Sequence, residues 1–124
     1  IVNITSAMVK SPHAVMGLST AARAGLTALS KALSREAIID NVTINNLLPG
    51  KFDTDRLATT MQAVATKTGK SSQEVRVAQQ AQIPAGRFGT PEEFGAICAF
   101  LCSVHGAYIT GQNVLADGGA FAGV

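Results

Sequence analysis

The apolar residues between positions 18 and 39 recur every three or four residues, the spacing of one face of an α-helix. This pattern predicts a helix of about six turns from about Leu18 to Ile39. The apolar face consists of Leu18, Ala22, Leu26, Leu29, Leu33 and Ala37. A stripe of small residues, where another backbone can approach closely, consists of Ala21, Ala24, Gly25, Ala28 and Ala32. A polar stripe, which we expect to be solvated, consists of Thr20, Arg23, Thr27, Ser30, Lys31 and Ser34.

Three short runs predict strands, and the first, which is rich in β-branched side chains, is consistent with a buried strand. The first is Ile1–Thr5, which a loop over residues 7–17 follows. The second is Val42–Leu48, and Pro49-Gly50 stops it because proline has no N–H to give to a ladder. The last, at about Asn113–Ala116, is closed by the sequence Asp-Gly-Gly.

Two helix signals lie in the long polar stretch Lys51–Gln82. Ser71 and Glu74 form a capping box for a short helix. A longer amphipathic helix is indicated upstream by Leu57, Met61, Val64 and Ala65. An excursion of this length inside a small domain is typical of a lid or binding loop.

The last helix has the clearest start in the chain. Thr90 caps it, Pro91 takes the first helical position and Glu93 completes a capping box, and the helix runs to about Ser103. The order of elements is therefore strand, helix, strand, lid, helix, strand. Strands that alternate with helices predict an α/β fold with right-handed crossovers and a parallel sheet of three strands flanked by helices.

In open α/β sheets, ligands bind beyond the carboxyl ends of the strands. Here those ends are Ser6, Pro49-Gly50 and the Asp-Gly-Gly sequence at 117–119. The first two carry a hydroxyl and exposed backbone groups suited to a ligand. The pattern alone thus predicts where a site lies, without its chemistry.

Composition narrows the class of protein. The chain has 124 residues, 47% of them hydrophobic, and a net charge of +2, which indicates one small folded domain. Its ten basic residues are dispersed, whereas a nucleic-acid binder would cluster them, and its apolar runs are too short to span a bilayer. The chain lacks an initiator Met and opens on a strand, so we expect a fragment of a longer protein.

Cys98 and Cys102 stand four residues apart on one helix face, and no other ligands occur at metal spacing. We therefore predict two buried thiols, no metal, and a reduced, cytoplasmic protein. The sequence TGKSS (68–72) resembles the end of a phosphate-binding loop. It lacks the Gly five residues before Gly69 and the preceding strand, and no dinucleotide fingerprint G-x-G-x-x-G occurs in the chain.

Four stretches in order resemble the C-terminal half of a short-chain dehydrogenase/reductase. IVNITS (1–6) is similar to the strand that ends in that family's catalytic serine, and VTINNLLPGKFDTDRL (42–57) to its strand and Pro-Gly loop. PAGRFGTPEEFGAICAFLCS (84–103) and YITGQNVLADGG (108–119) are similar to its last helix and strand. The resemblance implies the C-terminal half of a Rossmann-like, doubly wound parallel sheet. Residues 1–124 would form part of a single domain with a lid at about 51–82, and the N-terminal dinucleotide-binding half would be absent.

The family's chemistry is hydride transfer between NAD or NADP and a carbonyl or alcohol. Its catalytic Ser, Tyr and Lys imply catalytic roles for Ser6, for Ser19 thirteen residues later, and for Arg23. Ser-x-x-x-Arg thus stands in place of Tyr-x-x-x-Lys, as in divergent members with a Leu-Ser-x-x-x-Arg-x-Gly helix start, which LSTAARAG (18–25) resembles. A phenol with a reference pKa near 10 can be drawn toward neutrality by a cation, whereas a serine hydroxyl is a far weaker acid. Arginine keeps the charge of the lysine but cannot shuttle protons.

The resemblance also implies that Arg23, Pro49, Gly50 and Thr54 bind the cofactor. The proton donor stays open between His13, Tyr108, Asp55 and a water. Each position has a structural interpretation beside the functional one. Arg23 suits a solvated polar stripe, the Ser6 hydroxyl a bond to backbone, and Thr54 the cap of the following helix.

The sequence therefore predicts an NAD(P)-dependent oxidoreductase, similar to 3-oxoacyl reductases, in the full-length protein, with the fragment alone inactive. The alternative is a non-catalytic dinucleotide-binding scaffold or sensor. The expected partner is a small carbonyl or alcohol substrate, with no nucleic acid and no membrane. The small-residue stripe, with the family's habit of packing this helix against a second copy, predicts a homodimer or homotetramer.

Overall fold

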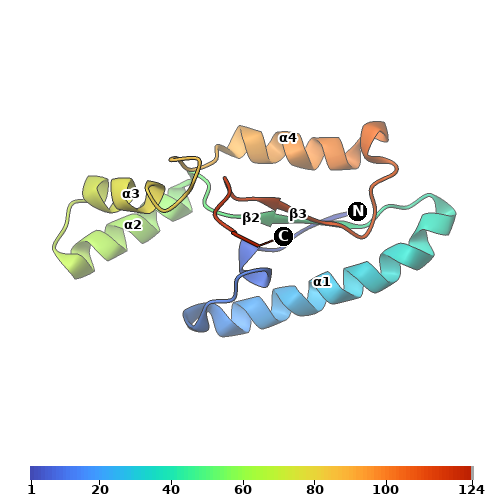
Figure 1. Ribbon diagram of the computed structural model, residues 1–124, viewed down its shortest axis with the longest axis horizontal. Helices are drawn as coiled ribbons and strands as arrows, with labels where there is room; N and C mark the ends of the chain where they lie inside the picture. The colour runs from blue at the N-terminus through green and yellow to red at the C-terminus, as the bar shows by residue number, and fades with distance from the viewer. Residues whose placement is uncertain (124) are drawn as a thin grey trace.

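The computed structural model, which describes residues 1–123, is built on a sheet of three parallel strands (Figure 1). These are β1 (Val2–Ile4), β2 (Asn45–Pro49) and β3 (Asn113–Ala116), in the spatial order β1-β2-β3. Asn3 lies opposite Asn46, and Asn46 lies opposite Asn113. The α/β class and the parallel topology predicted from the sequence are confirmed.

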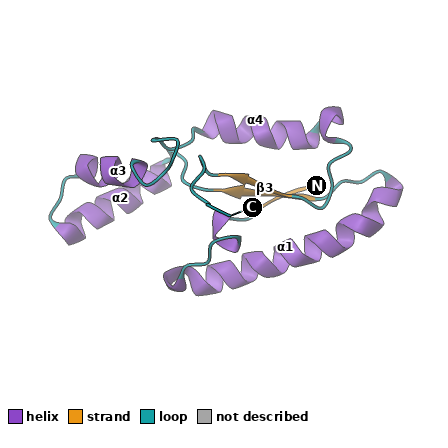
Figure 2. Ribbon diagram, viewed as in Figure 1, coloured by secondary structure: helices purple, strands orange, loops and turns teal. Residues whose placement is uncertain are grey.

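Two helices sandwich the sheet, as Figure 2 shows. The long helix α1 (Gly17–Ala37) covers one face and α4 (Pro91–Cys102) covers the other. A 3-10 turn at Ile38–Asp40 continues α1, and two more, at Ala7–Val9 and Ala14–Met16, occupy the predicted loop before it. A fourth 3-10 turn, Val104–Gly106, follows α4. The capping box of α4 is present as predicted.

A helical hairpin stands beyond the carboxyl ends of the strands (Figure 1). It consists of α2 (Asp55–Thr68) and α3 (Ser72–Gln80), joined through Gly69, whose left-handed φ of 69° ends α2. The hairpin has its own apolar core with the segment that follows it, formed by Met61, Ala65, Val75, Ile83 and Phe88. The predicted lid is therefore a packed substructure, with the Ser71–Glu74 capping box in place.

The second strand starts three residues later than the sequence pattern predicts. The backbone N–H of Val42 bonds to the last turn of α1 through the carbonyl of Ala37 (3.1 Å), and that of Ile44 bonds to Oγ1 of Thr110 (3.1 Å). The N–H groups of these two residues thus bond to a helix carbonyl and to a side chain, and not to the backbone of a neighbouring strand. Pro49, expected to stop the strand, is its last residue, where its missing N–H costs little.

Helix α1 packs on the sheet with the face that the sequence pattern assigns to solvent. The buried positions are hydroxyl residues, namely Thr20, Thr27, Ser30 and Ser34. Leu18, Leu29 and Leu33 of the apolar stripe are exposed by 93%, 55% and 45%. The expected solvation of the polar stripe is therefore wrong for these four hydroxyl residues, and the helix leaves an apolar face uncovered.

The cysteine prediction is also wrong in part. Cys98 is half-buried and Cys102 is exposed, and both are free thiols. Burial, with the neighbouring Cys102 thiol, raises the pKa of Cys98. Within residues 1–123 we find no helix with the length and apolar character needed to cross a bilayer.

Candidate functional site

The carboxyl ends of all three strands meet at one cavity of about 330 Å³. Ser6 comes from the end of β1, Pro49 and Gly50 from the end of β2, and Asp117 from the end of β3. The predicted position of the site, at this edge of the sheet, matches the cavity. Met8, Ile83 and Phe121 add apolar wall, and His13 and Lys51 add polar groups.

Gly50 lets the ends of β2 and β3 approach one another. A Cβ at this position would lie 2.7 Å from Cβ of Asp117 and 2.8 Å from its Cα. Such contacts are far shorter than van der Waals packing, so glycine is the residue that fits. The carboxylate of Asp117 accepts hydrogen bonds from the N–H groups of Gly119 (3.0 Å) and Phe121 (2.8 Å), which folds the chain after β3 over the cavity.

Ser6 serves the local backbone and faces the cavity. Its Oγ accepts a hydrogen bond from the N–H of Met8 (3.2 Å) and so caps the first 3-10 turn. The hydroxyl proton remains to be donated, because a hydroxyl is a donor as well as an acceptor. The structural interpretation and the functional one are thus compatible at this residue.

Ser19 and Arg23 form one unit at the start of α1. Nη1 of Arg23 donates to Oγ and, at 3.2 Å, to the carbonyl of Ser19, one helical turn earlier. Nε donates to the carbonyl of Thr5 (3.2 Å), the peptide that precedes Ser6. Arg23 is half-buried and tied to the end of β1, so its interpretation as a solvated residue is wrong. Neither Ser19 nor Arg23 lines the cavity that holds Ser6.

Two buried hydroxyls beside this unit were missed by the sequence analysis. Thr5 and Thr20 are 4% and 9% exposed, and within residues 1–123 their Oγ1 atoms have no hydrogen-bond partner. Each adjoins a residue of the Ser6, Ser19 and Arg23 set in the chain. Threonine in a strand or helix of this kind carries no pattern that marks it as unpaired, so the sequence held no usable signal.

The structure separates the remaining candidates. Oγ1 of Thr54 accepts from the N–H of Leu57 (3.3 Å) and caps α2, and Thr54 lines neither cavity. His13 lines the cavity with Ser6, and its Nδ1 accepts from the N–H of Val15 (3.4 Å). Tyr108 is fully exposed and lines neither cavity, and Asp55 lies in the first turn of α2. Of the named proton donors, His13 alone shares a cavity with Ser6.

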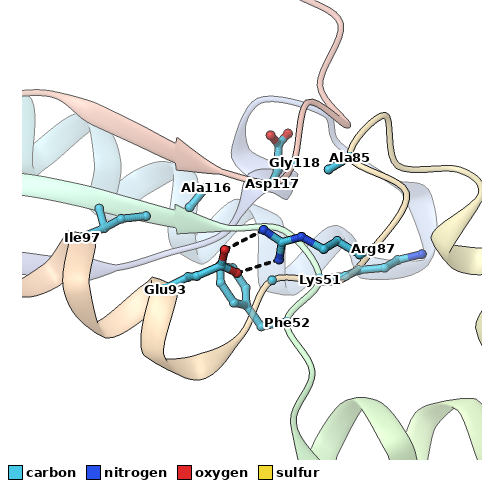
Figure 3. Close-up of a pocket in the computed structure, with 10 residues that line it drawn as sticks. Lys51, Phe52, Ala85, Arg87, Glu93, Ile97, Ala116, Asp117 and Gly118 are labelled. Carbon is cyan, nitrogen blue, oxygen red and sulfur yellow. Dashed lines mark hydrogen bonds and ion pairs between the residues drawn. The ribbon is translucent and has the colours of Figure 1, made fainter.

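A second, smaller cavity of about 180 Å³ lies between α4, the end of β3 and the loop after β2 (Figure 3). Arg87 and Glu93 close one side of it through a bidentate pair at 2.8 and 2.6 Å. The two bonds from Arg87, with a third from the N–H of Thr90, lower the pKa of Glu93 to about 2. The bonds to Glu93 also raise the pKa of Arg87. Lys51 lines both cavities, so the loop after β2 is a wall common to the two.

Comparison with known proteins places this geometry in a family. The family model described as Enoyl-(Acyl carrier protein) reductase matches residues 1–120. The chain is 35% identical over 121 residues to the 3-oxoacyl-[acyl-carrier-protein] reductase FabG of Vibrio cholerae, and 38% identical over 120 residues to the NADPH-dependent reductase BacG of Bacillus subtilis. These matches cover 98% and 97% of the chain, but 45% and 46% of the relatives.

A solved structure agrees with the sequence relatives. The crystal structure of YwfH, an NADPH-dependent reductase involved in bacilysin biosynthesis, superposes with a TM-score of 0.92 at 35% identity. The superposition covers 100% of this chain and 47% of that one. The chain belongs to the short-chain dehydrogenase/reductase family and corresponds to the C-terminal half of its domain. It spans less than half the length of the relatives that it matches.

The backbone at the strand ends fits the nicotinamide end of an NAD(P) molecule better than the side chains do. Arg23 is a fixed cation whose Nη2 takes part in no hydrogen bond within residues 1–123, but Arg23 does not line the cavity. Pro49 and Gly50 present backbone at the cavity, whose volume falls in the range of small-molecule sites.

Proposed function

We propose that this chain is the substrate-binding half of an NAD(P)-dependent oxidoreductase in its full-length protein. The reaction is hydride transfer between the nicotinamide and a carbonyl or alcohol substrate, similar to that of 3-oxoacyl reductases. The observation that carries the proposal is the cavity shared by Ser6, Pro49, Gly50 and Asp117, at the sheet edge where α/β folds bind ligands. The names of the relatives FabG and BacG support the same class of reaction.

Each candidate residue takes one role in the proposed reaction. A bound nicotinamide would supply or accept the hydride. Ser6 donates its hydroxyl proton as a hydrogen bond to the substrate oxygen, since its other bond uses a lone pair. Arg23 binds ribose hydroxyls and stabilises negative charge. Ser19, held by Arg23, keeps a water or a substrate hydroxyl in place.

Proton transfer is the step of the proposed reaction that these residues support least. A tyrosine whose pKa a lysine lowers is a competent general acid, and general acid catalysis contributes on the order of 10²–10⁴-fold. Neither Ser19 nor Arg23 replaces it, because one is too weak an acid and the other does not deprotonate. The proposed enzyme is therefore slower in its proton step than members with Tyr-x-x-x-Lys.

A second candidate function follows from the same substitution. A protein that binds the dinucleotide without turnover, as a scaffold or sensor, needs the Pro-Gly backbone and Arg23 but no acid. Neither Ser19 nor Arg23 lines the cavity that holds Ser6, and this separation favours binding over a complete proton relay.

Turnover by the protein expressed from its complete coding sequence tests the two candidates. NADPH or NADH oxidation is followed with a 3-oxoacyl thioester and with simple ketones, and nucleotide binding is titrated in parallel. Turnover supports the oxidoreductase, and binding without turnover supports the scaffold or sensor. The double variant Ser19→Tyr, Arg23→Lys should raise kcat on the order of 10²-fold. The single variant Arg23→Lys is its control.

We also propose a homodimer or homotetramer and a cytoplasmic location for the full-length protein. The uncovered leucines of α1 support the assembly, and the free thiols support the location. Residues 1–124 by themselves should show no activity, because they match less than half of the relatives' length and contain no dinucleotide fingerprint. Assay of the isolated chain beside the complete protein checks this.

A further inference from the structure

The loop that leaves β2 is held to the strand-like segment before α4. The N–H of Gly89 donates to the carbonyl of Lys51 (3.1 Å), and the N–H of Asp53 donates to the carbonyl of Gly89 (2.8 Å). Phe52 lies on Gly89, where no larger residue fits, and its ring meets Phe94 edge-on at 5.1 Å. These contacts hold the loop to Gly89 and to α4, and none of them supports it from α3.

Arg76 of α3 supplies that support. Its guanidinium makes a bidentate pair with the carboxylate of Asp53, with Nη1 to Oδ1 at 2.9 Å and Nη2 to Oδ2. The same guanidinium lies 5.1 Å from the ring centroid of Phe88, which is buried in the hairpin core. Arg76 is thus held between an anion and an aromatic face, a geometry that suits arginine and not lysine.

This pair joins the entry of the α2–α3 hairpin to the middle of its second helix. Asp53 lies just before α2, whereas Arg76 is on α3, twenty-three residues later. Beyond α3, the N–H of Ala85 donates to the carbonyl of Gly118 (3.0 Å), so the exit of the hairpin is tied to the end of β3. The Asp53–Arg76 pair therefore links the entry of the hairpin to α3, the helix that leads to its exit.

We propose that Arg76 is a positioning residue for the ligand site, and that its pair with Asp53 latches the α2–α3 hairpin against the Pro-Gly loop. The loop carries Lys51, which lines both cavities, and it leads into Thr54. Opening the latch therefore moves the cavity wall while leaving Ser6 and Arg23 in place. The effect on ligand binding rests on the proposed function, whereas the latch itself does not.

The latch has a clear signature in the protein expressed from its complete coding sequence. Arg76→Ala should weaken nucleotide or substrate binding, read as Kd or KM, by about fivefold while kcat changes less. Amide hydrogen exchange of residues 51–60 should quicken. Arg76→Lys should lie between the two because it keeps the charge and loses the fork. Asp53→Ala combined with Arg76→Ala should be no worse than either alone, and 0.5 M salt should reduce the difference from wild type.

Arg56→Ala is the matched control, because Arg56 is an exposed arginine of α2 that forms no ion pair within residues 1–123. It should leave binding and exchange unchanged. The latch is overturned if Arg76→Ala or, should that variant fail to fold, Arg76→Lys and Asp53→Asn show wild-type exchange and affinity. A wild type without turnover would instead contradict the oxidoreductase, and exchange with nucleotide titration would still decide the latch.

Discussion

At the scale of single residues, Gly50 is a position where the backbone that follows β3 leaves no room for a side chain. Gly50→Ala would place a methyl 2.7 Å from Cβ of Asp117, so the ends of β2 and β3 must separate. We expect a loss of about 1–3 kcal/mol in the free energy of unfolding, measured by urea denaturation of the complete protein. Gly95→Ala is the control, because a Cβ added at Gly95 in α4 would have nothing within 4 Å and alanine is the better helix former. Equal stabilities for the two variants would contradict the close approach.

Asn46 is the centre of a polar row across the sheet. Its Nδ2 donates to Oδ1 of Asn113 (2.9 Å), and its Oδ1 accepts from Nδ2 of Asn3 (3.3 Å), which also donates to Oγ of Ser30 (2.9 Å) on α1. Asn46 is 1% exposed, so Asn46→Ala leaves a buried gap and removes one of the two acceptors of the half-buried Asn3 amide. We expect a cost of about 1–3 kcal/mol in chemical denaturation.

Asn113→Ala is the matched change, since Asn113 is exposed and water can replace its bond to Asn46. It should cost clearly less than Asn46→Ala. The idea of a stabilising row fails if Asn46→Ala is neutral or if the order of the two variants is reversed.

The site residues show what single-residue reasoning reaches. Ser6, Pro49 and Gly50 were predicted at the strand ends, and they line one cavity because parallel strands bring their ends together. Arg23 was weighed as solvated, and its bonds to Thr5 and Ser19 were not foreseen. Those bonds depend on where the helix lies against the strand, and sequence spacing does not contain that placement.

At the scale of elements, α1 shows why periodicity alone misjudged a face. Thr27 donates its hydroxyl to the carbonyl of Arg23 (2.8 Å), Ser30 to that of Leu26 (2.7 Å) and Ser34 to that of Lys31 (2.9 Å). A hydroxyl bonded to its own helix is satisfied, so it can be buried against the sheet without loss. The period of the helix was predicted correctly, but the pattern does not say which stripe meets the sheet.

Helix boundaries were predicted well where capping residues mark them, as at Ser71 and Thr90.

The first turn of α4 also contains an ion pair whose contribution to stability depends on pH. Glu93 has a pKa of about 2, below its ordinary 4.5, because it accepts bonds from Arg87 and from the N–H of Thr90. A depressed carboxylate pKa contributes stability above the ordinary value, and this contribution is lost as pH falls toward the folded value.

We therefore expect the melting temperature of the complete protein to fall between about pH 4.5 and 2, in part through this group. Glu93→Gln should lower it at pH 7 and weaken its decline over that range, which calorimetry across pH measures. Glu92→Gln is the control, because Glu92 is the neighbouring acid in the same first turn and forms no ion pair within the described residues. An unchanged pH profile in Glu93→Gln would rule out this group as a source of acid sensitivity.

At the scale of the whole molecule, the chain has two packed regions and one uncovered face. The sheet is sandwiched by α1 and α4, and the hairpin has its own core beyond the strand ends (Figure 1). The outer face of α1 carries exposed leucines that neither region covers. Apolar faces of this kind are typical of interaction surfaces, and the proposed assembly places a second copy there.

Leu29→Lys tests that assembly. Leu29 is 55% exposed near the middle of the face, and in a twofold dimer the change occurs on both subunits at one interface. Removing two buried leucines should raise the dimer Kd on the order of 10²–10⁴-fold, as sedimentation of the complete protein would show. Val104→Lys is the matched control, because Val104 is 83% exposed in the turn after α4 and should leave the assembly intact. If Val104→Lys dissociates the protein and Leu29→Lys does not, the subunits meet through the α4 side, and the leucines of α1 face something other than a second copy.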